Sequence, residues 1–153
     1  MIKAYYEEIT HGVGYYELER GGINRNSIQV GFEPEFISKE SIDGTIYRKL
    51  KGYRMNASWS YPMLHKGERE EIMFLLREQA ASGKGILMEM DIPYTPPRST
   101  SEYISDYKFK GYVYLTISSN GKFGYSQPLN DYIWSGFTLS VTSRELIKDT
   151  SLM

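Results

Sequence analysis

The chain has 153 residues and a mass of 17.7 kDa, which predicts a single domain spanning residues 1–153. Its composition, 41% hydrophobic and 24% charged, is typical of a folded globular protein. The absence of cysteine excludes disulfide scaffolds, thiolate metal sites and cysteine catalysis. With 18 basic and 19 acidic side chains the net charge is −1, so no basic excess favours general binding of nucleic acid.

The N-terminal region has the weakest pattern. Its first eight residues contain no apolar core of a signal peptide, so we expect none. We interpret residues 1–26 as an extended or assembly-dependent segment, with an edge strand over Tyr15 to Glu19. The longest nearly apolar run in the whole chain, residues 72–76, is far shorter than the ~20 residues that a membrane helix needs.

A hairpin is predicted around Asp43-Gly44, because Asp-Gly favours a two-residue type I′ turn. A strand over residues 35–42 precedes this turn, and a long strand over 46–59 follows it. Gly52 marks a bulge in the long strand. Beyond the bulge, apolar residues alternate with polar ones and share one face of the strand: Tyr53, Met55, Ala57 and Trp59.

One helix is predicted from Lys66 to Ser82. Ile72, Leu75, Leu76 and Gln79 follow helical spacing and form one narrow stripe. Acidic residues occupy the first turn, where they complement the helix dipole, and Gly83 is suited to end the helix. A helix with a single apolar stripe must pack on another element, and we expect that element to be a sheet.

The C-terminal half returns to strand patterns. Short and long strands are predicted over 86–90 and 107–118, and Asn120-Gly121 is a second type I′ candidate that turns the chain into 123–125. The last predicted strand runs unbroken over 132–142. The whole pattern predicts a mainly β (α+β) fold, an antiparallel β-sandwich or partly open barrel with one packed helix.

A search for catalytic and metal-binding patterns finds none that carries a reaction. His11 and His65 lie in no metal-binding spacing. Two carboxylate pairs at strand spacing, Glu33 with Glu35 and Glu89 with Asp91, are also typical of solvated strand faces. We therefore expect no enzyme activity, no catalytic residue, no metal, no cofactor and no small-molecule substrate. An enzyme with an unrecognised site remains the least favoured alternative.

A cluster of cations and a set of tyrosines are the candidate contact residues. The cations, which form a charged contact face or keep an exposed strand from aggregating, are Arg48, Lys49, Lys51 and Arg54. The chain holds 14 Tyr against 6 Phe, and Tyr is favoured where one end of the ring is buried and the other is wet, as at interfaces. Trp59 and Trp134 are interpreted as core anchors.

A long Pro-rich loop is predicted over residues 92–106. Loops of more than ~12 residues are usually functional or disordered, and prolines lower the entropy lost on docking. We expect this loop to dock on a neighbouring subunit. Together with the tyrosine doublets it supplies the candidate subunit-interface residues: Tyr5, Tyr6, Tyr15, Tyr16, Tyr94, Arg98 and Tyr103.

The order of these features resembles a known family. A strand ending at Trp59, an acidic helix start over 68–76, a glycine stop, the strand 86–90, a Pro-containing loop and a closing segment over 134–139 follow one another. This resembles the small structural tail proteins of long-tailed bacteriophages and prophages, those with a tail-tube or distal-tail β-sandwich. The resemblance spans roughly residues 30–145 and is one of pattern.

The resemblance implies a virion structural protein that assembles with itself into a ring, commonly six-fold, and contacts neighbouring tail proteins. It implies a channel through which DNA passes, a location in the virion tail, and host cytoplasm during assembly. Tube protein, terminator and baseplate adaptor all stay open. Two features depart from this family. The strand Arg48–Arg54 is basic, whereas the lining of a tail tube is usually acidic, and the chain is too short for the second, carbohydrate-binding-like domain of many distal-tail proteins.

The alternative hypothesis is a carbohydrate-binding β-sandwich, with Asn130 and Asp131 as candidate acceptors of hydrogen bonds from sugar hydroxyls.

Overall fold

The computed structural model describes residues 2–8, 12–18, 22–23, 27–92, 104–105 and 107–147. These residues form one helix and eleven strands: β1 (Ile2–Glu8), β2 (Gly12–Glu17), β3 (Gln29–Glu40), β4 (Ile46–Tyr61), β5 (Leu64–His65), α1 (Lys66–Ser82), β6 (Ile86–Asp91), β7 (Ile104–Ser105), β8 (Lys108–Ser119), β9 (Lys122–Ser126), β10 (Asp131–Ser135) and β11 (Phe137–Ser143).

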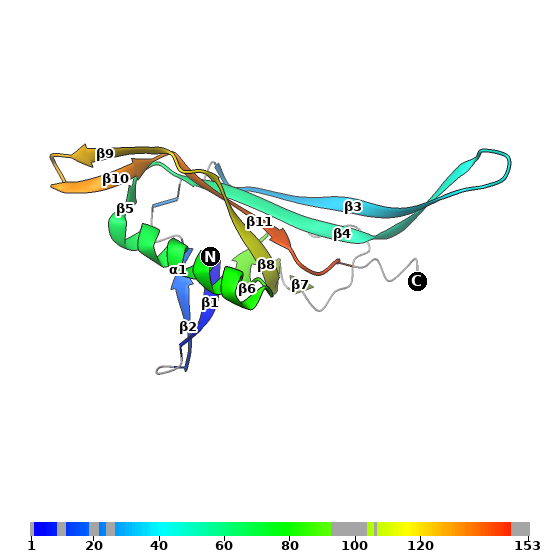
Figure 1. The fold of residues 1–153 in the computed structure, drawn as a ribbon, viewed down its shortest axis with the longest axis horizontal. Coiled ribbons are helices and arrows are strands. Elements are labelled where there is room, and N and C mark those ends of the chain that lie inside the picture. The colour runs from blue at the N-terminus through cyan, green and yellow to red at the C-terminus, as the bar shows by residue number, and fades with distance from the viewer. Residues whose placement is uncertain are drawn as a thin grey trace.

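The strands form two antiparallel sheets. The larger has eight strands in the order β2-β1-β6-β8-β11-β4-β3, with β7 beside β8, and the smaller has the order β5-β10-β9. Figure 1 shows α1 along one side of the strands, with the β3–β4 and β9–β10 hairpins reaching out at opposite ends. The expected mainly β class with one helix and antiparallel sheets is confirmed, and the strands do not close into a barrel.

The core lies between α1 and one face of the larger sheet. Every second side chain is buried from Met55 to Tyr61 in β4, from Phe109 to Leu115 in β8 and along all of β11, as strand geometry requires. The Nε1 atom of Trp59 donates to the Tyr61 hydroxyl at 3.0 Å, and that hydroxyl donates to the Leu18 carbonyl at 2.9 Å. Trp59 is buried, so its predicted role as a core anchor is confirmed.

The helix has the predicted bounds, Lys66 to Ser82, and ends at Gly83 with a left-handed φ of 67°. Ile72 and Leu75 are buried, while Leu76 packs at the margin of the core. Gln79, on the same stripe, makes hydrogen bonds instead. Its side-chain amide accepts from the Leu115 N–H at 2.6 Å and donates to the Leu115 carbonyl at 2.9 Å.

Both predicted type I′ turns are wrong. Only the glycine of each pair has positive φ, 86° at Gly44 and 67° at Gly121, whereas type I′ needs positive φ at both central residues. At the first turn the Gly44 N–H donates to the Ser41 carbonyl, so Ile42 and Asp43 form a turn that Gly44 closes. This is the arrangement of a three-residue hairpin loop with a glycine bulge.

Gly121 does not form a hairpin turn at all. It passes the chain from β8 in the larger sheet to β9 in the smaller sheet. A Cβ at this position would lie 2.2 Å from the Ser135 carbonyl oxygen, so the crossing needs a residue without a side chain.

The predicted unbroken last strand over 132–142 is also wrong. Gly136, with φ 73°, divides it into β10 and β11, which belong to different sheets. The alternating pattern continues across Gly136 and predicted one strand, although a glycine inside a strand pattern can mark a bulge or bend, as it does at Gly52. The bulge predicted at Gly52 is confirmed, since the β3–β4 register shifts at that point.

Candidate functional site

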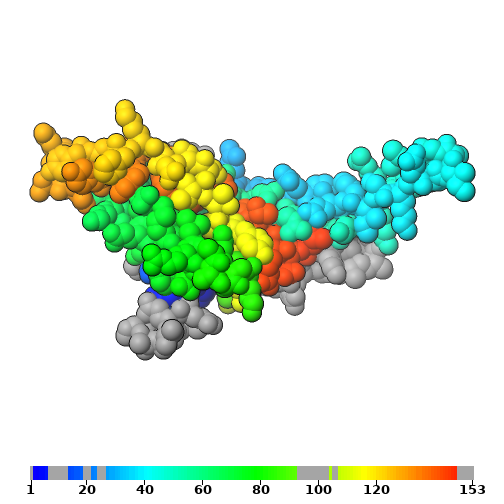
Figure 2. Space-filling model, in the orientation of Figure 1, coloured from blue at the N-terminus to red at the C-terminus, as the bar shows by residue number. Residues whose placement is uncertain are grey.

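The distal part of the β3–β4 hairpin, residues 36–51, forms a projecting arm. Figure 2 shows it standing clear of the rest of the molecule. Among the described residues, β3 and β4 pair only with each other along the arm, because β11 pairs with β4 from Asn56 onward. An isolated two-stranded hairpin is marginally stable in water, and unpaired strand edges are templates for further pairing. The arm therefore has the character of a contact element.

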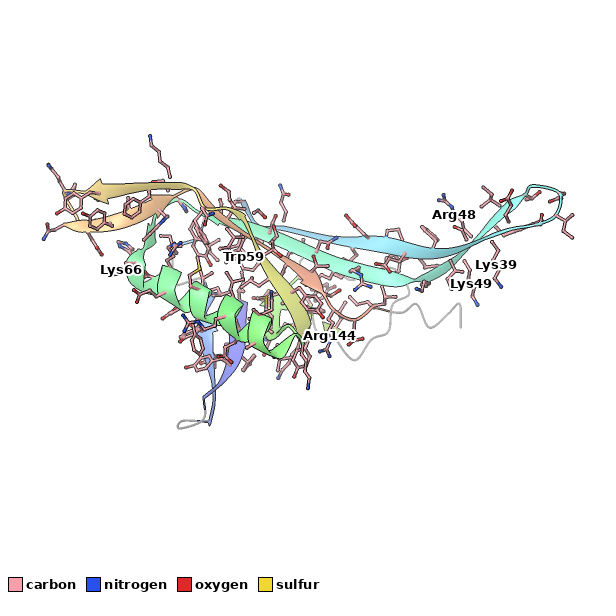
Figure 3. The ribbon with its side chains drawn as sticks, viewed as in Figure 1. Lys39, Arg48, Lys49, Trp59, Lys66 and Arg144 are labelled. Atoms are coloured by element: carbon pink, nitrogen blue, oxygen red, sulfur yellow. The ribbon has the colours of Figure 1, made fainter. Side chains whose placement is uncertain are left out.

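Apolar side chains lie on both faces of the arm. The register places Phe36, Ile46 and Arg48 on one face, which we call face A. It places Ile37, Lys39, Tyr47 and Lys49 on the other, which we call face B. The four apolar residues expose 44–63% of their surface, and Ile42 at the tip is fully exposed. Figure 3 shows Arg48 on the side of the ribbon opposite Lys39 and Lys49.

The base of the arm is fixed by Arg54. Its Nε atom lies 2.6 Å from Glu35 Oε1, and its Nη1 atom donates to the Ser143 and Arg144 carbonyls at 2.8 and 2.9 Å. The hydrogen bond from Arg54 holds the pKa of Glu35 below its usual range. Arg54 thus ties the arm to the end of β11.

The cationic cluster predicted as one charged face is divided in the structure. Arg54 makes its contacts within the chain, while Arg48 and Lys49 lie on opposite faces of the arm.

The tip of the arm is ordered by Asp43. Its carboxylate accepts from the Ser41 hydroxyl and from the Thr45 N–H, the latter at 3.0 Å. These hydrogen bonds, with that from Ser41 the largest cause, lower the pKa of Asp43 from 3.8 to about 2. The ionised carboxylate therefore stabilises the turn that presents Ile42.

The β9–β10 hairpin carries four aromatic rings on one face. Cross-strand pairs place Tyr132 opposite Tyr125 and Trp134 opposite Phe123. The centroids of Phe123 and Tyr132 are 5.2 Å apart with nearly parallel rings, and those of Phe123 and Trp134 are 4.9 Å apart. Phe123, Tyr125 and Tyr132 are each about half exposed. We call these four residues the ladder.

The ladder is attached firmly to the body at its Trp134 end. The Arg69 guanidinium of α1 lies 4.6 Å from the centre of the Trp134 ring, a cation–π contact. On the other side Trp134 pairs with Leu64 of β5, which is buried. Trp134, predicted as a core anchor, is only partly buried and joins the exposed rings to the core.

Exposed apolar surface is concentrated in these two hairpins. Fourteen large hydrophobic residues are exposed among the described residues, and nine of them lie on the arm or the β9–β10 hairpin. Contiguous exposed apolar patches mark interaction sites. Neither the exposed apolar residues of the arm nor the ladder was predicted from the sequence. The alternation of aromatic residues in 123–125 and 132–134 was the signal that four rings share one face.

The predicted tyrosine doublets are divided between the two faces of the sheet. Tyr6 stacks on Tyr16 with centroids 4.6 Å apart, and both contact Phe74 of α1 edge-on. Tyr5 and Tyr15 lie on the opposite face, 5.7 Å apart. Burial, together with the Glu89 carboxylate to which its hydroxyl donates at 3.0 Å, raises the pKa of Tyr5.

Other candidate residues lie elsewhere or outside the described part. Tyr94, Arg98 and Tyr103 lie outside the described residues, as does most of the predicted loop 92–106. Asn130 accepts a hydrogen bond from the Tyr125 hydroxyl at the end of the β9–β10 hairpin.

The face of the larger sheet that α1 does not cover has a shallow trough of about 460 Å³. Most of the side chains that line it are uncharged: they include Gln29, Asn56, Ser58, Ser140 and Thr142.

The described residues contain no group of three or more His, Asp or Glu side chains placed to hold a metal ion. In the same part of the chain, no helix has the length and apolar character needed to cross a membrane.

Comparisons with protein-family models and with curated protein sequences give no match.

Proposed function

We propose that this protein is a non-enzymatic structural subunit that assembles with further copies of itself through projecting hairpins. The observation that carries the proposal is the arm. Its two strands have no other partner among the described residues, and its apolar side chains are exposed on both faces. A chain gains stability by covering such surface, since each Å² of apolar area removed from water contributes ~25 cal/mol.

A ring is the assembly that best fits this shape. The arm and the β9–β10 hairpin project from opposite ends of the molecule (Figure 1). Contacts between two different surfaces lead to rings when the rotation closes and to filaments when it does not. This agrees with the resemblance to phage tail proteins, which implies a ring in a virion tail as tube, terminator or baseplate adaptor, with neighbouring tail proteins as further partners.

The test is the mass distribution of the purified protein over a concentration series, measured by mass photometry or light scattering. We expect closed rings or growing filaments from the natural chain. A variant in which Asn-Gly replaces residues 39–47 keeps the Ser38–Arg48 pair and loses the tip of the arm. We expect this variant to stay monomeric.

The matched control is Met63→Ser, which removes an exposed large side chain outside both hairpins. It should assemble like the natural chain. A natural chain that stays monomeric at every concentration would contradict self-assembly, and full assembly of the shortened variant would contradict the role of the arm.

A second candidate function is binding of carbohydrate, and the trough favours it. Amide and hydroxyl side chains such as Asn56, Ser58 and Thr142 are suited to hydrogen bonds with sugar hydroxyls. A glycan array separates the two functions. Binding that Asn56→Ala abolishes would support the second candidate, whereas a structural ring protein should bind nothing on the array.

A further inference from the structure

We infer that face B of the arm docks on the ladder of the next copy of the chain, in a head-to-tail contact. This inference rests on the proposed function, and it names the two surfaces that meet. Face B consists of Ile37, Lys39, Tyr47 and Lys49, and the ladder consists of Phe123, Tyr125, Tyr132 and Trp134.

The exposed apolar surface of the two hairpins lies at both ends of the molecule (Figure 1). The arm is largely aliphatic at its exposed positions, with three isoleucines, while the ladder is aromatic. The two surfaces lie at opposite ends of the molecule, so neither can cover the other within one chain (Figures 1 and 2). A second copy supplies the missing surface for each, and every copy uses both of its ends.

The arm and the rest of the chain carry net charges of opposite sign. Residues 36–51 carry four cations and two anions, and the chain has a net charge of −1, so the rest of the chain carries −3. The arm of one copy is therefore attracted to the body of another. The first six residues of α1 carry three anions, Glu68, Glu70 and Glu71, against two cations, Lys66 and Arg69. Complementary charges of this kind speed association and fix orientation.

Face B is better suited than face A to contact the aromatic rings of the ladder. Face B has two lysines and no acidic residue, and no ion pair in the described part of the chain involves either lysine. On face A, Arg48 already lies 6.0 Å from the centre of the Phe36 ring, and Glu40 adds a negative charge. Lysine over an aromatic ring is a favourable contact. The same pairing occurs within the chain, where the Lys3 ammonium lies 4.8 Å from the centre of the Tyr15 ring.

The arm and the ladder are each anchored to the body at one end. Arg54 fixes the base of the arm, and Arg69 together with β5 fixes the base of the ladder. Anchoring the base of each surface reduces the conformational entropy that is lost when the two surfaces meet. The arm and the ladder are therefore suited to dock on each other without rearrangement of the body.

The test uses two variants of the full chain that each lack one surface. Ile37→Ser/Tyr47→Ser removes the apolar side chains of face B, and Tyr125→Ser/Tyr132→Ser removes half of the ladder. All four residues are exposed, so the core is untouched. Circular dichroism and melting temperature should match those of the natural chain. Each variant alone should lose every species above the monomer in mass photometry.

The equimolar mixture of the two variants gives the decisive result. The intact arm of the ladder variant can dock on the intact ladder of the arm variant, and no further contact is possible. We expect a species of twice the chain mass and nothing larger. Phe36→Ser/Ile46→Ser, the matched control on face A, should assemble like the natural chain.

Several outcomes would overturn the inference while leaving the proposed function standing. These are assembly of the ladder variant like the natural chain, a mixture that forms no dimer, or loss of assembly in the face A control alone. Should the ladder variant fold poorly, Lys39→Glu/Lys49→Glu on face B must lower assembly at least tenfold, and equal assembly would contradict the inference. If the natural chain binds a glycan and the ladder variant loses that binding while it still assembles, the ladder would be a sugar-binding surface and not a contact between copies. A natural chain that never assembles would refute the proposed function itself.

Discussion

Replacing Gln79 by leucine tests what this residue contributes to stability. It either fills an apolar contact or makes the hydrogen bonds that a neighbouring strand would otherwise make. By spacing, Gln79 belongs to the apolar stripe of α1, and leucine should improve such a stripe. In the structure its amide pairs with both backbone groups of Leu115. β6 begins at Ile86 opposite Val113, so Leu115 lies beyond the start of its neighbouring strand. Gln79 supplies the hydrogen bonds that β6 does not reach.

The expected magnitude follows from these two bonds. Leaving a buried donor or acceptor unpaired costs ~1–3 kcal/mol. Leu115 is buried but Gln79 is partly exposed, so we take the lower end of this range, about 1 kcal/mol, for each of the two bonds. Gln79→Leu should then lower the free energy of unfolding by about 2 kcal/mol. For a chain of this length that corresponds to a fall of about 4–8 °C in Tm.

The assay is urea unfolding followed by tryptophan fluorescence, to which the buried Trp59 contributes together with Trp134, with Tm from circular dichroism. Arg77→Ala, an exposed position on the same helix, is the control and should change the free energy by less than about 0.5 kcal/mol. The Leu115 amide should also exchange faster in the Gln79→Leu variant. Equal or greater stability of that variant would refute the reasoning, because it would show that the apolar stripe outweighs both hydrogen bonds.

Three further predictions concern the core, the crossing between the sheets and the arm. Tyr61→Phe removes the hydroxyl between Trp59 Nε1 and the Leu18 carbonyl, and should lower the free energy of unfolding by about 1–3 kcal/mol in urea titration; no change would show that water replaces it. Gly121→Ala should lower Tm because its Cβ would meet the Ser135 carbonyl at a φ of 67°, whereas Gly124→Ala, with open space around it, should leave Tm unchanged or slightly raised. Asp43 has a lowered pKa of about 2, so its stabilisation of the turn is complete above the ordinary pKa of 3.8 and is lost as the pH falls through about 2. The amide resonances of Gly44 and Thr45 should titrate with a midpoint near 2, and a midpoint near 4 would contradict the hydrogen bonds of that carboxylate.

Local patterns in the sequence determined most of the secondary structure. The helix bounds, the burial alternation of β4 and β8, and the bulge at Gly52 followed from spacing, because helical and strand periodicities are properties of short segments. The mainly β class with one packed helix followed in turn, since one apolar stripe needs a sheet to cover it.

Only the tertiary structure decided how the strands divide between sheets and where the contact surfaces lie. Alternation continues unbroken through Gly136, and the change of sheet there depends on which strand each half finds as a partner. Strand alternation by itself places Arg48 and Lys49 on opposite faces, so the single charged face was wrong already at the level of the sequence. Only the tertiary structure shows that Arg54 contacts Glu35 and two distant carbonyls.

The exposure of the arm and the ladder is likewise not determined by local sequence patterns. Their exposure depends on the absence of a covering element among the described residues, and that absence is a property of the whole arrangement in space. A sequence pattern records which side chains share a face. It does not record whether anything lies against that face, because covering segments come from distant parts of the chain or from another copy of it.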